Sequence, residues 1–184
     1  MSSQSSRQQM MDNGLVYFTN QGRAAILALD PTAMVTVGFF APQGPNVTRT
    51  GDTRVIQVYP AIANSTADFV DLHPYALAGG LTLQQYVQNF GFAQAQQYTQ
   101  PVVMAEWGEL QADYPVESDA AKVAHDWQVQ SCSYGFKGWV WFTWDTTNTE
   151  YNLVGGPLYW SATAGSGLIN QSLSPLARRD PCAN

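Results

Sequence analysis

A glutamate stands at the end of an apolar run, where a charge is unfavourable unless it is used. Glu106 follows Val-Val-Met-Ala and precedes Trp-Gly. Burial of a carboxylate is costly unless the group is paired or takes part in chemistry. The position therefore predicts a functional carboxylate, although a salt bridge at a sheet edge would explain the same residue.

Two further apolar runs end in side chains that suit the same chemistry. His73 and Tyr75 lie two residues apart, as do Phe142 and Trp144, so in a strand each pair points to one side. One carboxylate, a histidine, a tyrosine and flat aromatic rings together suit sugar chemistry. The alternatives are a structural hydrogen-bonding role for His73 and ordinary aromatic packing for Tyr75 and Trp144.

Four short apolar runs would position these side chains, namely residues 34–40, 69–75, 102–107 and 139–144. Near-continuous apolar runs of this length are typical of parallel strands buried on both faces. They follow one another at the spacing of a strand plus a crossover helix. Because ligand sites in parallel α/β proteins lie at the carboxyl ends of strands, the residues above are expected to meet there.

The segments between the runs are predicted to be helical. The expected helices cover residues 20–29, 55–63, 83–98 and 118–132. Thr82 precedes the third of these, and Ser118 begins the fourth, as expected N-caps. The prolines and glycines of residues 41–52 predict a loop. The order is a helix, three strand–helix repeats and a final strand, which is an α/β protein.

Composition excludes several classes of protein. The 184 residues suffice for one domain with a sizeable core, and 45% hydrophobic residues exclude wholesale disorder. Net charge is −6 with no run of Lys or Arg, which argues against nucleic-acid or anionic-membrane partners. No apolar stretch approaches the ~18–20 residues of a membrane span. No metal-ligand spacing is present, and no cofactor is expected.

The remaining chemically active side chains receive no catalytic role. Cys132 and Cys182 are either two unrelated thiols or a disulfide; the second would close a 50-residue loop (182 − 132), worth about 4 kcal/mol in the chain-entropy model. His125 is expected either on the surface of a helix or in packing, without a role in chemistry. Asp145 and Glu150 follow the last strand and are expected to be loop carboxylates.

These motifs resemble clan-A glycoside hydrolases, especially the cellulase-like family five. Residues 101–108, Pro-Val-Val-Met-Ala-Glu-Trp-Gly, resemble the seventh-strand motif of that family, which implies that Glu106 is the nucleophile. Residues 71–75 resemble its sixth-strand His-x-Tyr, which implies that His73 and Tyr75 orient the nucleophile and contact sugar.

The resemblance extends to both ends of this segment. Residues 28–38 resemble the junction leading into the fifth strand. Residues 139–145 resemble the eighth strand, which carries an aromatic platform for the sugar. Related sequences often have Trp where Phe142 stands, so Phe142 and Trp144 are competing candidates for that platform.

One part of the family pattern is missing. The acid/base glutamate of the family follows Asn at the end of the fourth strand, and none of the four glutamates here follows Asn. The second-strand arginine has no counterpart either. The resemblance therefore implies the C-terminal half of a TIM barrel, strands five to eight, N-terminally incomplete and without its acid/base. If two copies closed one barrel, Asp145 would be the only conceivable proton donor.

The expected organisation is a flexible tail over residues 1–12, a partial barrel over 13–160 and an irregular tail over 161–184. The resemblance implies retaining hydrolysis of a β-linked glucan or mannan by a parent enzyme that is secreted, although residues 1–9 contain no signal-peptide apolar segment. The alternatives are a non-catalytic carbohydrate-binding module and an interaction protein that self-associates through an open half-barrel.

Overall fold

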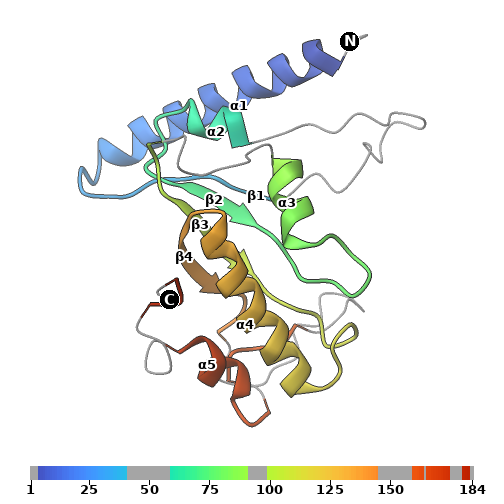
Figure 1. Cartoon of the computed structure of the whole chain (residues 1–184). Helices are drawn as coiled ribbons and strands as arrows, with labels where there is room; N and C mark the ends of the chain where they lie inside the picture. Colours follow the sequence, from blue (N-terminus) through green and yellow to red (C-terminus); the bar gives the residue numbers. More distant parts are fainter. Residues whose placement is uncertain are drawn as a thin grey trace.

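The computed structural model describes residues 4–40, 59–90, 99–144, 159–163, 165–174 and 180–182. In chain order the elements are α1 Gln4–Leu27, β1 Gly38–Phe40, α2 Tyr59–Ala63, β2 Val70–His73, α3 Leu83–Phe90, β3 Val102–Trp107, α4 Glu117–Ser133, β4 Phe136–Trp141 and α5 Leu168–Leu173 (Figure 1). Strands alternate with helices from α1 to β4, as the sequence predicts.

One four-stranded sheet organises the molecule. Its strands lie in the order β1-β2-β3-β4, and each pairs in parallel with the next. All four carboxyl ends therefore meet at one edge of the sheet. The expected α/β fold with four parallel strands and crossover helices is confirmed.

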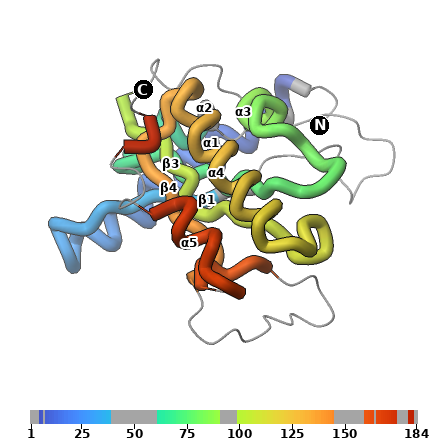
Figure 2. Tube along the Cα trace, turned by 60° about the horizontal axis from the view of Figure 1, so that its bottom comes forward, coloured from blue at the N-terminus to red at the C-terminus, as the bar shows by residue number. Residues whose placement is uncertain are grey.

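The main core lies between one face of the sheet and helices α3 and α4, which Figure 1 shows in front of the strands. Val70 and Leu72 of β2 and Met104 of β3 are fully buried in it. The rings of Tyr86 on α3 and Trp127 on α4 lie 5.8 Å apart and join the two helices. Helix α5 packs along α4 in both views (Figures 1 and 2).

Strand β3 has the predicted limits, but β4 does not. Strand β4 begins at Phe136 and ends at Trp141, whereas the aromatic residues of 139–144 predict a strand three residues later. Phe136 is buried and pairs with Val102, so it starts the ladder although it lies outside the aromatic run. Consequently Trp144 lies beyond the strand rather than in it.

One of the two predicted N-caps is correct. The backbone N–H of Gln85 donates to Thr82 Oγ1 at 3.2 Å, and the N–H of Thr82 donates back to Gln85 Oε1 at 2.8 Å, which is a capping box before α3. Ser118 is not a cap. The N-cap of α4 is Val116, in an extended conformation and without a side-chain hydrogen bond, so Ser118 lies in the first turn.

The expected tails contain helices. Helix α1 begins at Gln4, so most of residues 1–12 is helical. The amide of Gln8 donates to Asp12 at 2.7 Å, an i,i+4 contact that supports this polar first half. Arg23 makes two hydrogen bonds to Asp68 and ties the second half to the turn before β2. Helix α5 likewise lies within 161–184. The division of the chain into 1–12, 13–160 and 161–184 stays a prediction.

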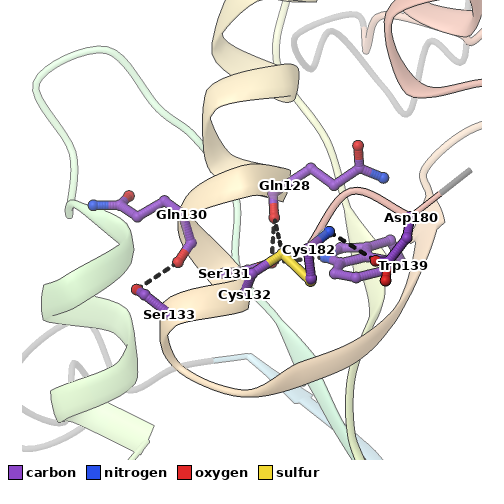
Figure 3. Close-up of a disulfide and its surroundings, with 8 residues drawn as sticks. All are labelled: Gln128, Gln130, Ser131, Cys132, Ser133, Trp139, Asp180 and Cys182. Atoms are coloured by element: carbon purple, nitrogen blue, oxygen red, sulfur yellow. Dashed lines mark hydrogen bonds between the residues drawn. A yellow bond between two sulfur atoms is a disulfide. The ribbon is translucent and has the colours of Figure 1, made fainter. Parts of the chain in front are cut away.

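The two cysteines form a disulfide. Cys132, at the end of α4, is bonded to Cys182, with their Cα atoms 5.3 Å apart (Figure 3). Beside it, the indole N–H of Trp139 donates to Ser131 Oγ at 2.7 Å and fastens β4 to the same turn of α4. Of the two alternatives for the cysteines, pairing is the one observed.

Some expectations lie outside the described residues: the loop at 41–52, the start of the helix at 55–63, the end of the helix at 83–98, and the carboxylates Asp145 and Glu150. In the described part of the chain, no helix combines the length and apolarity needed to cross a bilayer.

Candidate active site

Glu106 is brought to the carboxyl end of β3 by an irregularity in the sheet. Met104 pairs with Trp139 and Trp107 with Trp141, so three steps along β3 match two along β4. This bulge lets Met104 and Trp107 both enter the core, although strict alternation would send them to opposite faces. Glu106 is left on the other face with 29% of its side chain exposed.

Two side chains from β2 and its continuation contact the Glu106 carboxylate. The Tyr75 hydroxyl donates to Oε1 at 2.6 Å. His73 Nδ1 lies 3.5 Å from Oε2, which is ion-pair distance but too long for a strong hydrogen bond. Two of the predicted partners therefore flank the two carboxylate oxygens.

The Tyr75 hydroxyl is held in its protonated, donating form. Tyr75 is only 7% exposed. Burial, followed by the hydrogen bond to Glu106 and the charges of Glu106 and Tyr159, raises the pKa of Tyr75 well above its ordinary value. The hydroxyl can accordingly donate its hydrogen bond to Glu106 without losing its proton.

A glycine lets the strands approach closely here. Gly108 forms a parallel bridge with Tyr75, and its backbone oxygen accepts the N–H of Ala76 at 3.3 Å. A Cβ at position 108 would collide with the carbonyl oxygen of Phe142. This position consequently requires a residue without a side chain.

Aromatic rings surround the Tyr75–Glu106 pair. The rings of Tyr75, Phe142 and Tyr159 are mutually in contact, with centroids 5.2–6.4 Å apart. Phe142 is half-buried in this cluster, whereas Trp144 is 63% exposed. Among described contacts none joins Trp144 to Glu106, so the structure groups Phe142 with the site and leaves Trp144 as the open aromatic surface beyond it.

Two residues at this site were missed by the sequence interpretation. Tyr159 reaches it because Leu110 and Tyr159 form an antiparallel bridge; burial and then the charge of Glu106 raise the pKa of Tyr159. Asp71 Oδ1 lies 3.2 Å from His73 Nε2. Parity with His73 could have indicated Asp71, but nothing in the sequence around residue 159 points to the site.

Glu109 is a second carboxyl on the same segment, in a different environment. It is fully buried, and neither carboxyl oxygen has a hydrogen-bond partner among the described residues. Desolvation raises the pKa of Glu109 to about 9, so the group is uncharged at neutral pH. Full burial separates it from any ligand that would reach Glu106 through solvent.

Other predicted features concern residues away from the site. His125 lies on α4, with a 43% exposed side chain 3.5 Å from Asp126, which confirms it as a helix-surface residue. In the described part of the chain, no group of three or more histidine, cysteine, aspartate or glutamate side chains lies close enough together to hold a metal ion.

The parallel sheet and its crossover helices have the architecture of part of a TIM barrel. The X-ray structure of the endo-beta-1,4-mannanase from Thermotoga petrophila matches it with a TM-score of 0.57 and 16% sequence identity, over 92% of this chain and 41% of that chain. This chain thus spans less than half of the length of that enzyme. No protein-family model matches the sequence, and no curated protein matches it. At this identity the likeness shows the fold alone.

Proposed function

We propose that the chain is part of a retaining glycoside hydrolase that acts on a β-linked glucan or mannan, with Glu106 as its nucleophile. The observation that carries the proposal is the Glu106 carboxylate at the carboxyl end of a central parallel strand, hydrogen-bonded by Tyr75 and faced by His73. In this reaction the carboxylate attacks the anomeric carbon and forms a glycosyl-enzyme intermediate, which water then hydrolyses.

A second carboxyl group must protonate the leaving oxygen from about 5–5.5 Å away. Glu109 is buried and Asp145 lies outside the described residues, so the proposal assigns this group to the strands that complete the barrel. A TIM barrel has eight strands in roughly 250 residues, and this sheet has four. This segment contains no Asn-Glu pair, so the proposal places the acid/base carboxyl outside it.

The nucleophile can be tested without an acid catalyst. A 2-deoxy-2-fluoro-β-mannoside or glucoside with a dinitrophenolate leaving group needs no proton donor, because that anion departs unaided. Attack by Glu106 forms the bond to the anomeric carbon, breaks the bond to the phenolate and leaves the fluorosugar on the protein. We expect mass spectrometry to find this adduct on the peptide containing Glu106 and to find none in Glu106→Gln. An adduct elsewhere, or one that persists in Glu106→Gln, contradicts the proposal.

A carbohydrate-binding function without catalysis is the second candidate. The 63% exposure of Trp144 beside the Tyr75–Phe142–Tyr159 cluster favours it, since exposed flat rings suit the faces of sugars. Calorimetry with manno- and cello-oligosaccharides separates the two functions. Binding that Trp144→Ala abolishes, with no adduct at Glu106, supports the module and contradicts the nucleophile.

Self-association is a further possibility that the sheet favours. Strands β1 and β4 are its edges, and Val140 on β4 is 56% exposed. Unpaired edges are open to pairing with other strands. Two copies related by an axis along the barrel would place β1 of one beside β4 of the other, with all strands still parallel. Light scattering at several concentrations tests this, and a strict monomer contradicts it.

The disulfide supports the expected secretion of the parent enzyme. Disulfides persist in oxidising compartments and are rare in the cytosol, and Cys132 and Cys182 are paired here. Retention of that bond in protein isolated from the native host's medium would be the expected result. Recovery from the cell interior with both thiols reduced would count against it.

A further inference from the structure

The imidazole of His73 lies between two carboxylates. Its Nδ1 is 3.5 Å from Glu106 Oε2, and its Nε2 is 3.2 Å from Asp71 Oδ1. Asp71 and His73 share one face of β2, while Val70 and Leu72 occupy the core face. The three polar groups therefore form a row that crosses from β2 to β3.

This row becomes more buried away from Glu106. Side-chain exposure is 29% at Glu106, 13% at His73 and 12% at Asp71. A carboxylate as buried as Asp71 is unfavourable without a partner, and the imidazole of His73 is the ionisable group at ion-pair distance from it. Asp71 is thus placed to act on His73 rather than on a ligand in solvent.

The neighbouring strand is shaped around this pair. Gly38 of β1 stands opposite Asp71 in the ladder. A Cβ at position 38 would lie 2.8 Å from Asp71 Oδ2 and closer still to the His73 ring. Contacts below 3.0 Å require something to move, so any larger residue would displace the aspartate or the imidazole.

An imidazole has two nitrogens, and the partner of one fixes the orientation and proton placement of the other. We propose that Asp71 is a positioning residue for Glu106, acting through the imidazole of His73, in space that Gly38 provides. Asp71 Oδ1 lies at ion-pair distance from Nε2, without a hydrogen bond between them; this charge on one side of the ring favours the orientation in which Nδ1 faces Glu106, while the Tyr75 hydroxyl donates to the other oxygen of that carboxylate. The inference rests on the proposed nucleophile role of Glu106, but its geometric part is testable alone.

The first measurement needs no activity. The chain has two histidines, so nitrogen-15 spectra of the imidazoles give one pattern for His73 and an internal reference from His125. We expect Asp71→Asn, which keeps the size of the side chain, and Asp71→Ala to move the His73 nitrogen shifts and leave His125 unchanged. Gly38→Ala should also move the His73 shifts, although it alters neither partner.

A matched control exists on α4. Asp126 faces His125 as Asp71 faces His73, and Asp126→Asn should move only the His125 shifts. If Asp71→Asn and Gly38→Ala leave the His73 shifts as in the unaltered chain, the inference is overturned. General unfolding is recognised because it would move both histidines and the backbone amide spectrum.

The second measurement uses the fluorosugar reagent. We expect Asp71→Ala to slow labelling of Glu106 at saturating reagent by about 10- to 100-fold, with the reagent concentration for half-saturation unchanged. The labelling rate of Asp71→Asn should lie between those of the unaltered chain and of Asp71→Ala. Equal labelling rates in all three overturn the positioning role. If the unaltered chain is not labelled while the His73 shifts still respond, the nucleophile proposal fails and the Asp71–His73 contact stands.

Discussion

Two glutamates three residues apart occupy opposite environments. Glu106 is 29% exposed, accepts a hydrogen bond from Tyr75 and faces His73. Glu109 is fully buried, without a hydrogen-bond partner among the described residues, and the pKa of Glu109 is raised to about 9. The backbone around both is held in the same way, by bridges from residues 108 and 110.

The comparison shows that burial of a carboxyl group does not by itself mark a catalytic site. A perturbed pKa points to function with only moderate specificity, and of these two glutamates the one with the raised pKa is the one that solvent cannot reach. What distinguishes Glu106 is a set of donors converging on an accessible pair of oxygens. The proposed chemistry follows those partners and not the size of the pKa shift.

The largest expected effect separates the two glutamates by labelling. Glu106→Gln should lower the rate of fluorosugar attachment about a thousandfold or more, because the amide is not a nucleophile. Glu109→Gln makes the same chemical exchange three residues away and should leave the rate within about twofold, because a neutral group replaces a neutral group. Peptide mass spectrometry measures the labelling rates of both variants. An equal fall in rate in the two would contradict the different roles assigned to Glu106 and Glu109.

The next effect concerns stability against pH. Below the unfolded pKa near 4.5, protonated Glu109 contributes its full stability, which is lost as pH rises through the folded pKa of about 9. Glu109→Gln cannot ionise, so its unfolding free energy should gain on that of the unaltered chain by up to about 1.4 kcal/mol per pH unit between those values. Urea unfolding at pH 5 and pH 8 measures the difference in unfolding free energy between Glu109→Gln and the unaltered chain. The same difference at both pH values would contradict the prediction.

Glu117→Gln serves as the matched control for that series. Its carboxylate accepts hydrogen bonds from the backbone N–H groups of Ser166, just before α5, and of Leu168, the first residue of α5. Partial burial raises the pKa of Glu117, but these hydrogen bonds outweigh it and leave the pKa lowered. The carboxylate therefore stabilises the fold above its unfolded pKa, and this is lost as pH falls through the folded pKa. Glu117→Gln should lose stability at neutral pH, opposite to Glu109→Gln.

The smallest expected effect tests the hydroxyl at Glu106. Tyr75→Phe keeps the ring and removes the 2.6 Å hydrogen bond, so labelling should slow about 10-fold through lost orientation. Tyr159→Phe is the control, since its ring also contacts Tyr75 but none of the described hydrogen bonds joins its hydroxyl to Glu106. If both variants label equally fast, Tyr75 contributes packing alone.

The sheet was predictable because its strands are short, apolar and regularly spaced. Strand β3 has the limits that the sequence predicts, and Thr82 caps α3 as expected. The start of β4 could not be predicted, because Phe136, which pairs with Val102, lies outside the cluster of aromatic residues. The first half of α1 carries no apolar periodicity in the sequence, so only the structure shows that it continues the helix.

The site was predictable in part. Position at strand ends sufficed to bring Glu106, His73 and Tyr75 together. Asp71 could have been indicated by its parity with His73, but its place beside Gly38 across the ladder needed the structure. Tyr159 reaches the site only through a bridge to Leu110, which the sequence does not indicate. Burial of Glu109 could not be inferred either, because a charged residue after Gly108 would ordinarily be expected at the surface.

The bond between Cys132 and Cys182 changes what a protease could accomplish. The bond (Figure 3) closes residues 132–182, which include strand β4 and helix α5, into one covalent ring. A single nick anywhere in that ring opens it without releasing a fragment, so the severed pieces would still migrate as one molecule until a reductant is added. Survival in a digestive, protein-degrading setting would then depend on redox conditions as much as on the number of cuts.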